Sequence, residues 1–185
     1  MDKIEVTNLT EKLKTIALKT GFWETGMIQI DTLHYNSVVR KICMEKCQYY
    51  GTSWACPPAV GTLEQCRKRC EQYDYMMLFS GKYEIEDFFN SAKLLESISW
   101  FKKLVERFDK KISNFLSSYI LLSNEGCGVC QSCTWPDAPC RFPNKLYHSI
   151  EGYGFNINQL ADYAKMRYNN GQNTITYFGA LLFCN

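Results

Sequence analysis

The sequence predicts a single domain of the α/β or α+β class, with a small mixed sheet, flanking helices and two cysteine-rich loops at residues 43–58 and 126–143. Strand-like apolar runs alternate along the chain with segments of helical periodicity. Both cysteine-rich segments contain glycine and proline, which interrupt regular structure. Because 185 residues suffice for one apolar core and are few for two, we expect residues 1–185 to form one domain.

The first 35 residues predict an amphipathic helix followed by a strand. Thr10 can cap the start of this helix and Gly21 can end it. The alternation in "MIQIDTL", residues 27–33, is typical of a strand. The apolar face of the helix is formed by Leu13, Ile16 and Ala17.

The middle of the chain predicts a short helix, a buried strand and then one long helix. Residues 62–73 look helical with Thr62 as cap, and residues 73–85 are strand-like. Apolar residues then recur at steps of four and three, which places them on one stripe of a single helix. They are Leu94, Ile98, Phe101, Val105, Phe108, Ile112, Phe115 and Tyr119.

The last third predicts a short strand at residues 119–122, just before the second cysteine-rich loop. Short helices are expected at residues 144–151 and 158–168. The apolar run "TITYFGALLF", residues 174–183, predicts a closing strand.

Charge and hydropathy exclude several classes of partner. The net charge of +2 is too small to favour nucleic acid or a membrane surface, and the run Arg67-Lys68-Arg69 is expected to be a solvated helix face. The charged N-terminus lacks the apolar core of a signal peptide, and no apolar stretch approaches the ~20 residues of a bilayer span. We therefore expect a cytoplasmic protein, of undetermined oligomeric state, whose thiols are reduced rather than paired in disulfides.

The second cysteine-rich loop carries the most specific motif. In "GCGVCQSCTWPDAPCRFP" the cysteines follow the pattern C-x2-C-x2-C-x6-C; we call Cys127, Cys130, Cys133 and Cys140 the second thiol set. A tight three-cysteine run is typical of loops that wrap a 4Fe-4S cluster, as in bacterial ferredoxins. Zinc sites more often use separated pairs of cysteines, and the chain has only two histidines. An iron–sulfur cluster is therefore favoured, with zinc as the alternative.

The first cysteine-rich loop is one ligand short of a closed cluster. We call its cysteines, Cys43, Cys47 and Cys56, the first thiol set. Cys140 could supply the missing ligand, or Cys56 could instead complete the tight run of the second loop. Both crossed pairings would bring the two loops together around one or two clusters. The remaining cysteines, Cys66, Cys70 and Cys184, are expected in the core, where free cysteine is commonly buried.

Four further residues are candidates for contact with a cofactor. Gly126 and Gly128 would let the backbone approach inorganic sulfide, although a tight turn also explains them. Trp54, with Trp135, could shield a cluster from water or pack at the edge of the core. Arg141 could offset cluster charge, although a surface salt bridge is the plainer expectation.

The two loops also carry a family resemblance. "RKICMEKCQYYGTSWACPP" and "GCGVCQSCTWPDAPCRFPNKLYHSIEGYGFNI", with the closing "YFGALLF", resemble a prokaryotic family of predicted metal-binding proteins, domain of unknown function 2284. The resemblance spans roughly residues 15–183. It implies that both thiol sets bind metal, and it implies no particular reaction.

Three functions are compatible with these patterns. The first is a cytoplasmic iron–sulfur protein with an electron-transfer role and a redox partner protein. The second is an enzyme that uses an iron without a cysteine ligand on a small molecule, for desulfuration or reduction. The third is a structural zinc module.

Overall fold

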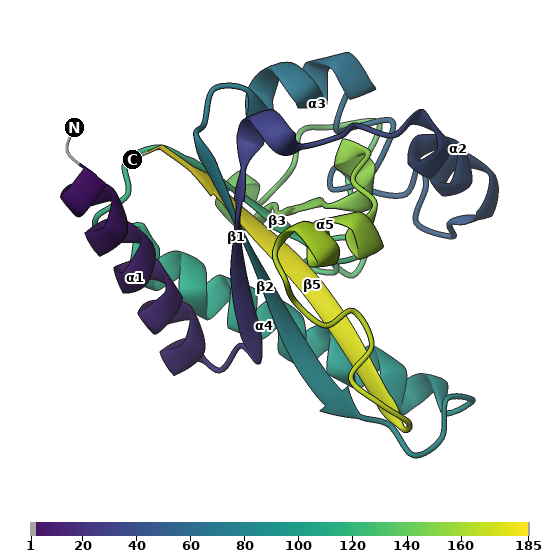
Figure 1. Ribbon diagram of the computed structural model, residues 1–185. Coiled ribbons are helices and arrows are strands. Elements are labelled where there is room, and N and C mark those ends of the chain that lie inside the picture. Colours follow the sequence, from purple (N-terminus) through teal and green to yellow (C-terminus); the bar gives the residue numbers. More distant parts are fainter. Residues whose placement is uncertain (1–2, 185) are drawn as a thin grey trace.

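The structure is a computed structural model that describes residues 3–184 and shows one small α+β domain built on a five-stranded mixed sheet (Figure 1). The strand order is β1-β2-β5-β3-β4. Neighbouring strands are antiparallel, except that β3 and β4 are parallel. The strands are β1 (Glu24–Gln29), β2 (Tyr75–Glu84), β3 (Tyr119–Ser123), β4 (His148–Ser149) and β5 (Thr174–Phe183).

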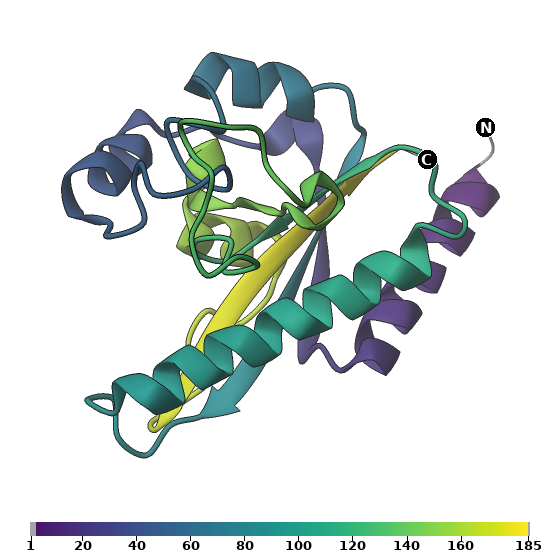
Figure 2. The same cartoon turned by 180° about the vertical axis from the view of Figure 1, so that it is seen from behind.

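Helices cover both faces of the sheet. Figure 2 shows α1 (Lys3–Thr20) and α4 (Ser91–Ile112) together on one face. The helices α3 (Leu63–Cys70) and α5 (Ile157–Tyr163) pack on the other face. The fifth helix, α2 (Ser37–Lys46), lies at the periphery and buries none of its residues (Figure 1).

The two long central strands are apolar on both sides because each side meets a helical layer. In β2, Met76 and Leu78 join the core under α3 and α5. Met77 and Phe79 join the core under α1 and α4. Successive side chains of a strand point to opposite faces, so a continuous apolar run predicts a sheet that is covered twice.

Several sequence predictions are confirmed. Thr62 caps α3 through a capping box with Gln65, and the closing strand has the predicted bounds. Gly21 follows the last residue of α1 with a φ of 117°, a conformation that glycine adopts without strain. Cys66 and Cys70 are fully buried core residues, as expected.

Other predictions about the elements are wrong. Thr10 lies inside α1 rather than at its start. The strand expected at residues 27–33 ends at Gln29 and continues as a 3-10 turn. The long helix ends at Ile112, so that Phe115 lies in a turn and Tyr119 begins β3.

The C-terminal corrections have tertiary causes. The helix expected at residues 144–151 is replaced by 3-10 turns around β4, because His148 and Ser149 pair with Leu122 and Ser123. The helix expected at residues 158–168 is only α5. Cys184, expected in the core, is exposed just past β5. None of the helices within residues 3–184 is long and apolar enough to cross a membrane.

Candidate metal centre

The first thiol set begins on α2. Asn36 caps this helix by accepting a hydrogen bond from Val38 N (2.8 Å), and Cys43 and Cys47 lie one turn apart at its C-terminal end. Arg40 holds the helix against the domain by donating to the carbonyl oxygens of Gly152 and Gly61, the second at 2.6 Å. A helix without buried side chains is thereby fixed in place by polar contacts.

A series of turns returns the chain to α2 and brings Cys56 beside the other two thiols. Gly51 N donates to Pro57 O (2.8 Å), which closes this loop on itself. The first thiol set lines one cavity of about 220 Å³, which we call the first cavity. Its other walls come from Val39, Ile42, Tyr49, Tyr50, Pro57, Glu125, Ser149 and Glu151.

Ionised groups are disfavoured in the first cavity. Burial raises the pKa of Cys43 to about 11 and raises that of Cys56, against a lowering hydrogen bond from the Ser149 hydroxyl. Burial also raises the pKa values of Glu125 and Glu151. Thiolates and carboxylates here would be stabilised by a cation, because the surroundings provide little solvation for negative charge.

The second thiol set is held by a loop stapled by its own side chains. Gly128, with a φ of 71°, makes the turn after Cys127. The Thr134 hydroxyl donates to Pro139 O (2.8 Å), and Arg141 Nη1 donates to Ser132 O (2.8 Å). Arg141 therefore ties the end of the loop to its middle and forms no salt bridge among the described residues.

All four thiols of the second set line one smaller cavity, of about 40 Å³, which we call the second cavity. Burial raises the pKa of Cys127, and a hydrogen bond from the Val129 backbone N–H to its sulfur opposes this rise. Backbone N–H donors to sulfur are a common feature of cluster-binding loops. The cavity is also lined by Ser53, Trp54, Gly128, Val129, Thr134, Arg141, Phe142 and Leu146.

The two cysteine-rich loops are in direct contact. Trp54 Nε1 donates to Ala138 O (3.1 Å), and its ring meets that of Trp135 edge to face at 4.7 Å between centroids. The Cys56 backbone N–H donates to Ser53 O (3.3 Å), and Ser53 also lines the second cavity. The two cavities are therefore neighbours, separated by residues of the first loop.

Neither crossed pairing of the thiols matches these cavities. Cys140 lies with the second set and Cys56 with the first. All ten cysteines are free thiols. Within residues 3–184, no three cysteine, histidine, aspartate or glutamate side chains converge as the ligands of a single metal ion do.

Gly126 is also accounted for by packing. It is buried, and a Cβ there would approach Tyr49 Cδ1 to 3.0 Å, which is tighter than ordinary van der Waals contact. The absence of a side chain therefore lets the second loop start directly against Tyr49 of the first. Gly126 supports the junction of the loops, whereas Gly128 makes a turn.

Sequence reasoning missed Lys102, on α4. Its amine donates to Cys127 O (3.1 Å), and burial lowers its pKa against the opposing charges of Cys127, Glu125 and Cys56. Its charge therefore acts on one cysteine of each thiol set, Cys127 and Cys56. Within the helical stripe, a lysine next to Phe101 carries no sequence signal for such a role.

The carboxylates of the first cavity were also missed as members of that site. Glu125 stands two residues before Cys127, yet it faces the first cavity instead of the second. Glu151 and Ser149 come from the segment that follows the second loop. The pairing of β4 with β3 positions this segment, and hydrogen bonds from Arg40 to Gly152 O and from Asn36 N to Gly154 O (2.8 Å) hold it against α2.

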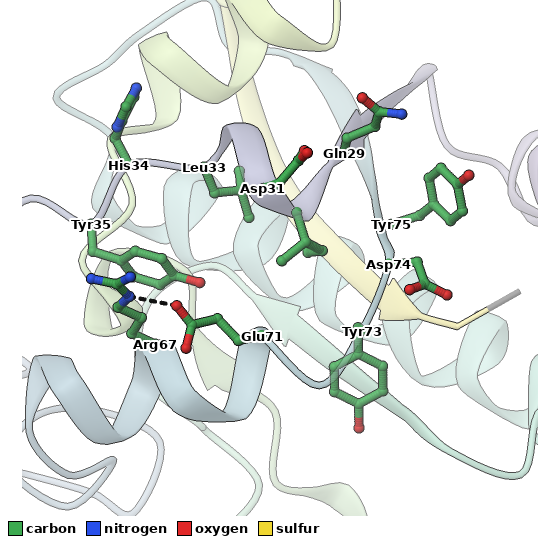
Figure 3. A pocket seen from close by; sticks show the side chains of 11 residues that line it. Gln29, Asp31, Leu33, His34, Tyr35, Arg67, Glu71, Tyr73, Asp74 and Tyr75 are labelled. Carbon is green, nitrogen blue, oxygen red and sulfur yellow. Dashed lines mark hydrogen bonds and ion pairs between the residues drawn. The ribbon is translucent and has the colours of Figure 1, made fainter.

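A larger hollow of the surface lies away from both thiol sets. A cavity of about 970 Å³ lies where the first 3-10 turn meets α3 and the start of β2, and its described lining residues include no cysteine (Figure 3). Arg67 and Glu71 form an ion pair across its wall (2.6 Å). This hollow is therefore separate from both thiol sets.

The chain was compared with curated proteins, solved structures and models of protein families. No curated protein and no solved structure matches the chain. The model of a family of predicted metal-binding proteins, domain of unknown function 2284, matches residues 26–183 and so includes both thiol sets. With most of its length matched, the chain belongs to this family of predicted metal-binding proteins.

Proposed function

We propose that the protein is an iron–sulfur protein whose second thiol set binds a 4Fe-4S cluster that transfers electrons. One observation carries the proposal: four free thiols from one loop line one cavity. Their C-x2-C-x2-C spacing is that of loops that place thiolates on separate irons of a cluster. Membership of a predicted metal-binding family supports the coarser part of this proposal.

The donor set and its surroundings fit such a group. Thiolates are the ligands that hold iron–sulfur clusters, and a bound cluster supplies one-electron transfer at low potential. The Val129 N–H stabilises negative charge on the Cys127 sulfur. Trp54 and Trp135 cover the loop on one side, and Lys102 offers a positive charge at Cys127. Each of these contacts affects the potential of a cluster or its exposure to water.

The first thiol set is proposed to hold a second cluster. Its three thiols share one cavity with two carboxylates, and the Ser149 hydroxyl contacts Cys56. Three cysteines leave one iron of a four-iron cluster without a protein thiolate. A cluster at the first set could therefore accept an electron and also bind a ligand at the iron that has no cysteine thiolate.

Electron exchange with a redox partner protein in the cytoplasm completes the proposal. Cys130 and Cys133 also line a groove of about 690 Å³ beside α4. Lys102, Lys103 and Lys145 line the same groove with Glu106 and Glu125, and Lys145 pairs with Glu106 (3.3 Å), so the lining carries a small excess of positive charge. A redox partner protein that docks on this groove would lie beside thiols of the second set.

Anaerobic purification followed by reconstitution with iron and sulfide tests this function. We expect about eight irons and eight sulfides per chain, from two clusters of four. The protein should be brown, and dithionite should reduce it reversibly with a paramagnetic signal. Stoichiometric zinc that resists replacement, with no iron and no accessible potential, would contradict the proposal and favour a structural zinc module.

A further inference from the structure

We propose that α2 is a closure element of the first thiol set, which opens as a unit when Arg40 releases the domain and which a metal group bound by the thiols holds closed. This inference rests on the proposed function only in placing a metal group at the first thiol set. It adds to that function a route by which the group enters the site and is retained there.

The attachment of α2 to the domain depends little on apolar contacts. The helix lies at the edge of the domain, away from the sheet (Figure 1). Its half-buried side chains are those of Val39, Arg40 and Cys43, followed by Cys47 at the end of the helix. Its bulky apolar side chains are instead more than half exposed; they are Val38, Ile42 and Met44. Helices in proteins gain most of their stability by packing an apolar face, so α2 lacks the usual means of attachment.

Arg40 joins the middle of α2 to the domain by polar contacts. Its guanidinium donates to Gly152 O and to Gly61 O, the second at 2.6 Å. A guanidinium presents its donors in a fixed planar fork, which allows one side chain to hold two separate segments. Asn36 N donates to Gly154 O (2.8 Å), but this hydrogen bond holds only the start of the helix. Loss of the two Arg40 contacts would therefore free most of α2.

The attachment of α2 decides whether the first thiol set is assembled. Cys43 and Cys47 belong to α2, whereas Cys56 is buried in the domain, where its carbonyl oxygen accepts from Val60 N (3.3 Å). Release of Arg40 would thus separate two thiols of the set from the third. Because an isolated helix of ten residues is marginal in water, a released α2 would also lose its helical hydrogen bonds.

A metal group bound by all three thiols would connect α2 to the domain a second time. The free energy of metal binding contributes to folding of the segment that supplies the ligands. Binding at the first thiol set would therefore hold α2 closed. The second thiol set comes from one loop that Thr134 and Arg141 close by their own hydrogen bonds, so the same opening does not apply to it.

Amide hydrogen exchange of the full chain, measured by mass spectrometry on peptides from α2, β2 and β5, tests this inference. The protein is compared in its metal-free form and after anaerobic loading with iron and sulfide. In the metal-free protein, the amides of residues 41–46 should be protected at least about a hundredfold less than those of β2 and β5. Loading should slow exchange in α2 by at least about tenfold, because the bound metal opposes opening.

Substitution of Arg40 tests how α2 is held. In the metal-free protein, Arg40→Met should speed exchange in α2 by at least about tenfold, which corresponds to about 1.4 kcal/mol. Arg40→Lys should give an intermediate rate, because one ammonium group does not reproduce the planar fork. Lys41→Met is the matched control, because Lys41 is exposed on the same helix and lines neither cavity. Arginine, lysine and methionine have similar helix propensities, so propensity does not account for a difference.

Three results would overturn this inference. They are equal exchange in the Arg40→Met and Lys41→Met proteins, exchange in α2 only as slow as that in β2 and β5, and no effect of a bound metal on α2. If Arg40→Met does not fold, the wild-type protein alone decides through the last two results.

The failures of the two proposals are distinguishable. Zinc in place of iron, with slowed exchange in α2, contradicts the proposed clusters and supports closure of α2. Iron-loaded protein whose α2 exchanges as fast as before loading contradicts closure of α2 alone. A folded chain that binds neither metal contradicts both proposals.

Discussion

The two thiol sets are neighbours, yet they are built in different ways. The first draws on α2, a loop closed by turns, and a segment that returns through β4. The second comes from one loop that is stapled by its own side chains. The first cavity adds two carboxylates to three thiols, whereas the second has four thiols, and Lys102 donates to the carbonyl oxygen of one of these cysteines, Cys127.

Under the proposed function, this difference gives the two thiol sets different tasks. Four cysteine thiols with a nearby cation favour a cluster that accepts an electron and keeps all its ligands. Three cysteine thiols leave one iron of a four-iron cluster free to bind a further ligand. Because Trp54, two residues before Cys56, donates to Ala138 O of the second loop, the two loops share one junction.

The largest expected effect comes from removing one thiol of each set. Cys130→Ser should lower the iron content from about eight to about four per chain, because only the second set loses a ligand. Cys43→Ser should lower it by a similar amount while the signal of the second set remains. Metal analysis with paramagnetic resonance measures both. If either single substitution removes all the iron, the ligands are shared between the sets and the separation is wrong.

Cys184→Ser is the matched control for these substitutions. Cys184 is an exposed free thiol that lies past the last strand, and its sulfur donates to Gln72 O (3.2 Å). Its replacement should leave the iron content unchanged. A loss of iron in this variant would show that thiols outside the two sets take part.

An intermediate effect is expected at Trp54, which joins the loops. Trp54→Ala removes both the hydrogen bond to Ala138 and the contact with Trp135, and should lower the free energy of unfolding by about 2 kcal/mol. Trp54→Phe keeps a ring and should cost about 1 kcal/mol, the value of one hydrogen bond. Urea unfolding measures these changes.

The same substitution sharpens the comparison between the cavities. Trp54 lines the second cavity and not the first, so Trp54→Ala should speed the loss of iron in air from the second set in particular. Trp100→Phe is the control, because Trp100 is half exposed on α4. Equal losses of iron from both sets would show that the junction protects them together.

The smallest effect is expected at Lys102. A positive charge stabilises the reduced form of a cluster, so Lys102→Met should make the reduction potential of the second cluster more negative by about 50 mV. For comparison, a tenfold change in a one-electron equilibrium corresponds to about 59 mV. Lys93→Met is the control, because this side chain is exposed on α4 and lines neither cavity nor the groove. An unchanged potential in the Lys102 variant would show that its amine serves only to hold Cys127 O. Protein-film voltammetry measures the shift.

Much of the fold could be predicted because the signals were local. Continuous apolar runs predicted the two central strands, β2 and β5, and the cap at Thr62 marked the start of α3. The segment at residues 144–151 was predicted wrongly because its helix-like composition is overridden by pairing of His148 and Ser149 with β3. Helix α2 escaped prediction because its apolar side chains are mostly exposed and make no buried face.

The sequence by itself determined which residues are able to bind metal. Cys127, Cys130 and Cys133 fall within seven residues, so the chain itself keeps their thiols close together. The family membership follows from the same motifs. Only the tertiary structure decided how the thiols are grouped in cavities and which charged side chains lie beside them. Glu125, Glu151 and Lys102 reach the thiols through a strand pairing and a helix crossing, and such long-range contacts leave no trace in local periodicity.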